Sequence, residues 1–158
     1  LTRAAVHSRK TYPHTPLRLY VEALGGVIKP VLDRNCSIGV IGSLPLVPDE
    51  LQSEPLPSTP LVTVVSPSHP LAKNRGVISV SAISKHVQLV LSDRTMLTAG
   101  RDFGVLSPLT WRLADLGAKH AFLKAGLGWG HMPLHMVKAD LDSGVLVKTA
   151  SRPSCALR

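Results

Sequence analysis

Apolar positions in the first third of the chain change their period twice, which predicts two strands with a short helix between them. Residues 17–21 alternate apolar and polar side chains, as in a strand with one covered face. Residues 36–41 form a continuous apolar run, which is typical of a strand covered on both faces. Residues 27–32 have helical spacing, and residues 1–11 indicate the exposed end of a helix that stops before Pro13. The strand–helix–strand order predicts a βαβ unit.

The second half of the chain repeats the alternation of strands and helices with clearer signals. The predicted strands are residues 61–65, 86–91 and 110–113, and the intervening loops include residues 42–60 and 95–109. Asp115 is placed to cap the N-terminus of a helix over residues 114–125. We expect Leu116, Phe122 and Leu123 of this helix to face the core.

The most distinctive segment is the sequence AGLGWGHMP at residues 125–133, in which three glycines are spaced two apart. Glycine removes the side chain where a backbone must bend or approach something closely. A polar helical turn follows, and then a strand that opens with Gly-Val-Leu-Val at residues 144–147. Such glycines alone indicate local geometry more often than a ligand site, so their meaning depends on the rest of the chain.

The net charge of +8 raises the question of nucleic-acid binding, but the basic residues are scattered singly. The chain has no run of four or more basic residues and no interleaving of aromatic and basic positions. We therefore do not expect this chain itself to bind DNA. A positive field still favours anionic small molecules in a cleft.

Targeting signals and cysteines give little further information. No apolar run approaches the roughly 18 residues needed to span a membrane, and residues 1–7 lack the apolar core of a secretory signal. We expect a cytoplasmic domain with no membrane partner and, because it begins with Leu1 and not Met, a piece of a longer protein. Cys36 and Cys155 make neither a disulfide framework nor a metal site, and Cys36 is expected to be a buried small side chain.

Three segments bring hydroxyl groups, a guanidinium group or bare backbone to the ends of predicted strands, where open α/β sheets bind ligands. The candidate ligand-binding residues are Gly42, Ser43, Ser92, Arg94, Thr95, Gly128 and Trp129. Arg94 has the geometry for a two-pronged contact to a carboxylate, and Trp129 for an apolar wall. The alternatives are local: the serines would stabilise turns, Arg94 would pair with Asp93 or Asp102, and Trp129 would pack between lobes.

Catalytic and metal-binding patterns are weaker. His131 and His135 have the i, i+4 spacing of two metal ligands on a helix, but Pro133 lies between them and no third ligand is close in sequence. The chain contains neither a Gly-x-Ser-x-Gly elbow nor a phosphate-binding Gly-x-x-x-x-Gly-Lys-Ser/Thr loop. We expect no enzymatic activity, no metal and no cofactor.

Taken in order, the motifs of this chain resemble those of the effector-binding domain of LysR-type transcriptional regulators. The matching pieces are residues 12–13 (YP) with 17–21, 31–33 (VLD) with 38–40 (IGV), 64–65 (VV) with 69–72 (HPLA), 125–130 (AGLGWG) with 132–133 (MP), and Leu141 with 144–147 (GVLV). Each motif is modest, and the ordered set over nearly the whole chain is more specific.

The resemblance implies an α/β fold of two Rossmann-like lobes, hinge-linked, of the type II periplasmic-binding-protein kind. Lobe I would comprise residues 1–76 and 139–158, and lobe II residues 77–138, with a small effector, expected to be a carboxylate, between them. The resemblance also implies a homodimer or homotetramer, and DNA binding only through an N-terminal domain outside this chain. The alternative is a solute-binding protein of a transporter, which shares the two-lobed fold.

Overall fold

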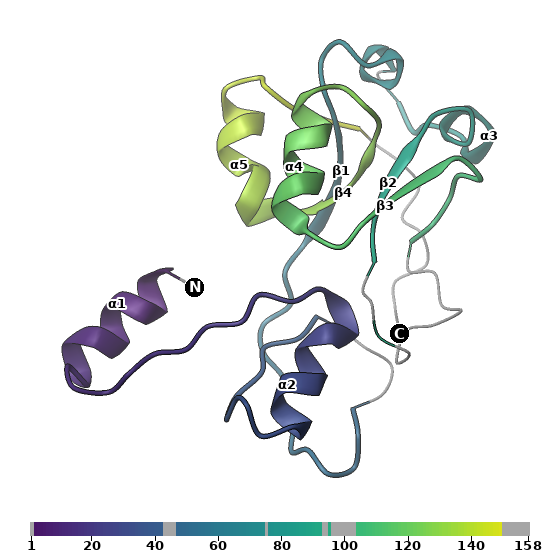
Figure 1. The fold of residues 1–158 in the computed structure, drawn as a ribbon. Helices are drawn as coiled ribbons and strands as arrows, with labels where there is room; N and C mark the ends of the chain where they lie inside the picture. The colour runs from purple at the N-terminus through teal and green to yellow at the C-terminus, as the bar shows by residue number, and fades with distance from the viewer. Residues whose placement is uncertain (1, 43–46, 75, 93–94, 96–103, 150–158) are drawn as a thin grey trace.

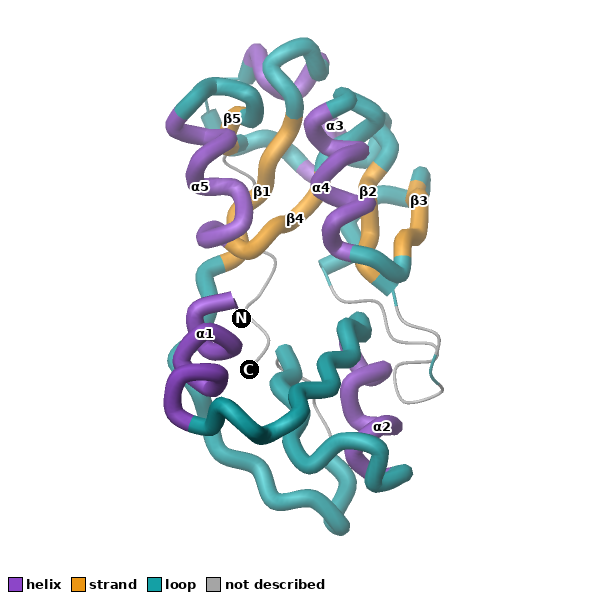
Figure 2. Tube along the Cα trace, turned by 60° about the vertical axis from the view of Figure 1, so that its left-hand side comes forward, coloured by secondary structure: helices purple, strands orange, loops and turns teal. Residues whose placement is uncertain are grey.

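In a computed structural model of the protein, the described residues are 2–42, 47–74, 76–92, 95 and 104–149. Within them, every strand lies in the half of the molecule formed by residues beyond 60, whereas the first 60 residues contribute helices and loops to the other half (Figures 1 and 2). We call the strand-containing half the sheet body. Among these residues no helix is both long and apolar enough to cross a membrane.

The helices predicted in the first third are confirmed. Helix α1, Thr2–Thr11, has no buried residue and lies on an arm that extends away from the rest of the molecule (Figure 1). A 3₁₀ helix, η1 (Leu24–Val27), continues directly into α2 (Ile28–Leu32), where Ile28 is buried. Cys36, expected to be buried, is only half-buried.

The two strands predicted in the same region are wrong, and with them the βαβ unit. Residues 17–21 and 36–41 form no strand. Apolar side chains in both segments are exposed to solvent, with Val21 75% and Ile38 82% exposed. A strand is defined by hydrogen bonds to a neighbouring strand, and none of the strands in the described residues pairs with either segment. Their apolar pattern therefore did not suffice to make a sheet.

The centre of the sheet body is β1, Leu61–Val65, confirmed as predicted. It pairs antiparallel with β4, Gly130–Pro133, and with β5, Val147–Lys148. Strand β4 was not expected, because a glycine and a proline bound its four residues and indicated a stop. Pairing with β1 determines its conformation in place of local propensity.

The other confirmed strands are β2, Gln88–Leu91, and β3, Thr110–Leu113, which pair in parallel. Strand β2 also lies beside the chain that enters β4, because the Leu89 amide donates to the Trp129 carbonyl at 2.8 Å. The reciprocal bond runs from the Trp129 amide to the Val87 carbonyl at 3.0 Å, and the two segments run parallel.

Helices cover the sheet body and close two apolar clusters. Helix α4, Leu116–Lys124, is capped as predicted by Asp115, whose Oδ1 accepts from the Ala118 amide at 2.6 Å, and α5, Leu134–Asp142, lies beside it (Figure 1). Between these helices and the strands lies a cluster of buried residues: Val62, Val64, Leu89, Leu123, Met132, Val137 and Leu146. A second cluster, close to η2 (Pro70–Lys73) and α3 (Val80–Ile83), contains Val65, Leu71, Ile78, Ile83 and Trp129.

The predicted boundary between lobes, at residues 76 and 77, falls inside this body. It assigns β1 to lobe I and β4 to lobe II, whereas the structure pairs Leu61 with Pro133 and Val64 with Gly130. The division of the chain into two lobes at these bounds stays a prediction. The sheet body begins with β1.

Candidate functional site

The carboxyl ends of β2 and β3 define the edge of the sheet body at which a ligand site is expected. The two strands are parallel, and β4 continues a segment that runs parallel to β2, so all three end on the same side. This side faces the half of the molecule that contains α2 (Figures 1 and 2). Open α/β sheets bind ligands at such an edge, where loops and helix N-termini converge.

One of the predicted ligand-binding residues, Ser92, lies at this edge. Ser92 follows β2, is half-buried, and its amide donates to the Leu113 carbonyl at 2.9 Å. Thr95 is half-buried as well. Gly42 is exposed in the other half of the molecule, and Ser43 and Arg94 lie outside the described residues.

Gly128 and Trp129 have structural surroundings that the sequence did not reveal. A Cβ atom on Gly128 would lie 2.5 Å from the Val87 carbonyl oxygen, so this glycine permits the close approach of two backbones. The Trp129 side chain is fully buried in the second apolar cluster, and its Nε1 donates to the carbonyl oxygens of Ile83 and His86. In this conformation the indole packs the core and presents no face to a ligand.

A group of buried polar residues around β4 was missed by the sequence analysis. It consists of Lys119 on α4, His131 on β4 and Thr63 on β1, and we refer to it as the Lys119–His131 cluster. The Lys119 side chain passes over Gly130 on the α4 face of the sheet, whereas the His131 ring lies on the opposite face with Thr63 and Trp129. Lys119 is 5% exposed, and its Nζ donates to the His131 carbonyl at 2.9 Å. His131 lies directly opposite Thr63 in the β1–β4 register, with 3.0 Å between its Nδ1 and the threonine Oγ1. A signal for Lys119 was present, because it has helical spacing with Leu116 and Leu123 and therefore occupies a core-facing position.

Burial lowers the pKa of both basic groups in this cluster. It lowers the pKa of Lys119 from 10.5 to about 8, because the ammonium has lost its hydration. Burial also lowers the pKa of His131, the positive charge of Lys119 lowers it further, and a hydrogen-bonding contact with the Gly104 backbone raises it. His131 Nε2 is buried, and this contact does not reach the geometry of a full hydrogen bond.

Gln88 fixes the chain segment that lies over the cluster. Its side chain is 2% exposed; Nε2 donates to the Gly104 carbonyl at 2.7 Å, while Oε1 accepts from the amides of Leu106 and Ser107. A Cβ atom on Gly104 would lie 3.4 Å from His131 Cδ2, so this backbone is in contact distance of the imidazole. The segment at residues 104–107 is thereby anchored to β2 and packed next to His131.

No metal site is assembled from the residues that the structure describes. His131 lies in β4 and His135 in α5, so the two histidines do not share a helix, and Pro133 marks the junction. Within the described ranges no three histidine, cysteine or acidic side chains are grouped for metal binding.

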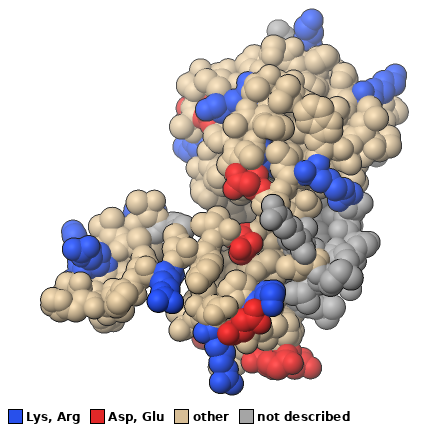
Figure 3. All heavy atoms as spheres, in the orientation of Figure 1, with Lys and Arg blue, Asp and Glu red and all other residues tan. Residues whose placement is uncertain are grey.

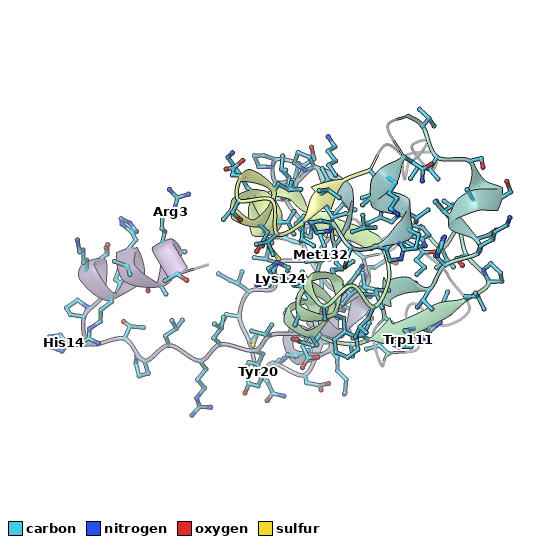
Figure 4. All side chains as sticks on the ribbon, turned by 90° about the horizontal axis from the view of Figure 1, so that it is seen from above. Arg3, His14, Tyr20, Trp111, Lys124 and Met132 are labelled. Carbon is cyan, nitrogen blue, oxygen red and sulfur yellow. The ribbon has the colours of Figure 1, made fainter. Side chains whose placement is uncertain are left out.

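The surface charge is spread out, as the sequence indicated. Figure 3 shows Lys and Arg side chains at separate places over the visible face without a single basic patch. Seen from above, Arg3 and His14 on the α1 arm are far from Lys124 and Met132 of the sheet body (Figure 4).

The described sheet body is an α/β fold whose parallel strands end on one side, and the comparison with known proteins identifies the family. The family described as LysR substrate binding domain matches residues 1–156. The chain therefore belongs to this family of effector-binding domains of LysR-type transcriptional regulators, and the resemblance found in the sequence is confirmed. The assignment supports a regulator over a transporter solute-binding protein.

Solved structures agree with this assignment. The regulatory domain of CcmR from Synechocystis PCC6803, in complex with 2-PG, has a TM-score of 0.70 and 14% identity, covering 96% of this chain and 74% of that one. The C-terminal domain of a probable LysR family regulator from Rhodococcus sp. RHA1 has a TM-score of 0.67 and 18% identity, covering 98% and 77%. The effector-binding domain of QuiR, in complex with shikimate, has a TM-score of 0.67 and 16% identity, covering 96% and 74%.

At these identities the structural likeness shows the fold, and it confirms the predicted α/β class of the type II periplasmic-binding-protein kind. A search of curated proteins found no match.

Proposed function

We propose that this chain senses a small anionic effector, a carboxylate, that binds between its two halves and thereby changes how the intact regulator binds DNA. The family match over residues 1–156 is the observation that carries this proposal. DNA contact is made by a domain outside this chain, the intact protein is a homodimer or homotetramer in the cytoplasm, and no membrane or catalytic step is involved.

The charge of the molecule and the chemistry of the edge support an anionic ligand. The chain has a net charge of +8, which attracts anions into a cleft between lobes. Ser92 and Thr95 place hydroxyl groups after β2, and Arg94, between them in sequence, has the planar donor geometry that matches a carboxylate. The domains of CcmR and QuiR, which share the fold, were solved with 2-PG and shikimate respectively.

Binding regulates only if the effector prefers one arrangement of the molecule over another. A ligand shifts an equilibrium between two conformations by no more than the difference between its affinities for them. A ligand held between two halves of a molecule meets this condition, because closing the halves adds contacts that the open arrangement lacks. Closing the two halves would then change the relative positions of the attached DNA-binding domains in the oligomer.

The test is isothermal titration calorimetry of this chain with a panel of small carboxylic acids, followed by the same titration of Arg94→Ala. We expect at least one acid to bind, and we expect the substitution to weaken binding by about 1.5 to 3 kcal/mol, the contribution of a charged hydrogen bond. Arg18→Ala is the matched control, because Arg18 is exposed in the other half, and it should bind as the parent does. Unchanged affinity in Arg94→Ala would remove this residue from the site.

A further inference from the structure

The α1 arm, residues 2–21, contains a helix that buries nothing against the described residues. Helix α1 has ten residues and none of them is buried, and residues 12–21 are all exposed. A helix of this length is only marginally stable in water by itself, because helices in proteins are held mainly by the packing of one face. The arm extends away from the rest of the molecule (Figure 1), so we look for its packing partner outside the described chain.

The arm borders an open hollow of about 520 Å³ between α1 and the extended segment that follows it. The chain reverses in a turn at residues 12–15, where the Thr15 amide donates to the Tyr12 carbonyl at 3.1 Å. All the residues that line the hollow belong to the arm, with Ala5 and Leu17 among the apolar ones. Arg9 is the lining residue that always carries a charge. We call this feature the arm hollow.

The arm is basic throughout its length. Residues 1–21 contain four Lys or Arg residues and neither Asp nor Glu. The ion pairs within the described residues involve none of these four. Figure 3 shows blue side chains and no red ones on the visible face of the arm. A surface with charge of a single sign attracts acidic partners.

An acidic counterpart to the arm hollow is present on the same chain. Residues 22–60 contain five acidic residues and two basic ones. Asp49 and Glu50 are the two central residues of a turn in which the Leu51 amide donates to the Pro48 carbonyl at 3.0 Å. Both acidic residues are exposed, whereas Pro48 and Leu51 are half-buried. Two carboxylates therefore stand at the tip of a short turn, and neither forms an ion pair within the described residues.

We propose that the α1 arm docks on a second copy of this chain, with the Asp49–Glu50 turn of one protomer in the arm hollow of the other. Each copy supplies one hollow and one turn, so a two-fold axis fills both hollows at once. The Arg9 guanidinium donates charge-assisted hydrogen bonds to the carboxylates of the turn. The contact also gives α1 the packing partner that it lacks. The inference rests on the homo-oligomer of the proposed function and does not depend on the effector.

The test reverses the charge on each side of the contact and follows the whole chain by sedimentation velocity at several concentrations. The arm variant is Arg9→Glu with Lys10→Glu, and the turn variant is Asp49→Lys with Glu50→Lys. We expect the parent to dimerise and each variant to dimerise about tenfold more weakly or worse, because attraction becomes like-charge repulsion at both hollows. Raising the NaCl concentration should weaken the parent dimer as well, because salt screens exposed charges.

An equimolar mixture of the two variants gives the decisive measurement. In a mixed pair, the acidic hollow of the arm variant meets the basic turn of the turn variant. The other hollow and the other turn keep their original charges. We therefore expect the mixture to recover the dimer that neither variant forms alone, and this recovery also shows that both variants fold.

The matched control is Arg3→Glu with Lys138→Glu, which changes the net charge by the same amount as the arm variant. Arg3 lies on the same arm (Figure 4) but does not line the hollow, and Lys138 is exposed on α5. This control should sediment as the parent does.

Two results would show that the arm hollow does not receive the turn of a second copy. If the arm and turn variants dimerise as the parent does, or if their mixture stays monomeric, the inference is wrong and the proposed homo-oligomer forms through another surface. If the parent itself is monomeric at every concentration, the inference and the proposed homo-oligomer are both wrong, and the basic arm faces a partner other than a second copy. Effector sensing is tested separately by calorimetry and stands or falls independently of these results.

Discussion

Single atoms decide how closely segments of the sheet body approach one another, and Gly128 shows this most clearly. Its Cα faces the Val87 carbonyl oxygen, and a Cβ atom there would lie only 2.5 Å from that oxygen. Gly130 is similar, with the Leu89 carbonyl oxygen 2.8 Å from its hypothetical Cβ. The two glycines of this motif therefore act in packing β2 against the chain that enters β4.

We predict that Gly128→Ala destabilises the chain by roughly 1 to 3 kcal/mol, the usual cost of forcing an extra carbon into a packed site. The neighbouring atom is backbone and cannot turn aside, so β2 itself would have to shift. Urea unfolding followed by circular dichroism measures the change. Gly76→Ala is the control, because a Cβ there meets nothing within 4 Å, and a similar loss in both variants would contradict the packing role.

His69 makes the stability of the fold sensitive to acid. It is 7% exposed, and its Nδ1 accepts a hydrogen bond from the Leu71 amide at the start of η2. Burial, and secondarily the charge of His86, lower the pKa of His69 below 6.5. In the window below pH 6.5 the unfolded chain binds more protons than the folded one, so stability is present above that pH and is lost as the pH falls.

We predict that His69→Asn reduces this acid sensitivity, because the amide oxygen still accepts at the helix start but does not titrate in this range. The measurement compares urea midpoints at pH 7.5 and pH 5.5 for the parent, His69→Asn and the exposed control His14→Asn. The parent and the control should lose more stability on acidification than His69→Asn. Equal losses in all three would show that His69 does not contribute.

At the scale of single elements, α4 depends on its first residue. Asp115 accepts from the Ala118 amide and satisfies one of the donors that a helix N-terminus leaves open. We predict that Asp115→Ala costs about 1 kcal/mol of stability, within the range of 0.5 to 2 for lost caps. Asp142→Ala is the control, because Asp142 makes only an exposed pair with Lys138 at the end of α5. If thermal melts show equal decreases in Tm for the two variants, the Asp115 cap does not contribute to stability.

Elements were predictable from the sequence where local pattern and tertiary pairing agree. β1 has five apolar or β-branched residues in succession, and α4 has both a cap and an apolar stripe, so both were found. β4 was missed because its pairing with β1 overrides its glycine and proline. The strand predicted at residues 17–21 is wrong for the opposite reason. Its local pattern is that of a strand, but no neighbouring strand takes up its backbone hydrogen-bonding groups, so these groups stay open to water.

The candidate site was less predictable than the fold, because it depends on register. The position of Ser92 directly after β2 was predictable from the sequence, and its role in ligand binding stays a prediction. His131 meets Thr63 only through the antiparallel alignment of β1 with β4, which joins residues 68 positions apart. Trp129, in contrast, was predicted from the sequence to form an apolar wall of the ligand site. In the structure its side chain is fully buried in the core.

At the scale of the whole molecule, the exposed apolar row at residues 17–21 bears on oligomeric state. Leu17, Leu19 and Val21 are 62%, 55% and 75% exposed and alternate along one extended segment. We predict that the chain self-associates through surfaces that include this row, in keeping with the proposed homodimer or homotetramer. Sedimentation velocity at several concentrations should show a species larger than a monomer, and Leu19→Lys with Val21→Lys should shift it toward the monomer.

The control for self-association is Leu56→Lys, which alters another exposed apolar side chain outside that row. It should sediment as the parent does. A parent chain that remains monomeric over the whole concentration range would contradict the prediction.

The central position of β1 has a consequence for how the protein is made on the ribosome. Among the described strands β1 comes first along the chain, and its two partners, β4 and β5, come from much later, with Val64 opposite both Gly130 and Lys148. During translation β1 therefore remains unpaired, with its buried side chains uncovered, until residues 130–148 have left the exit tunnel. Such non-local pairing slows folding and leaves the nascent chain open to aggregation, so this domain should depend on chaperones during synthesis more than its size suggests.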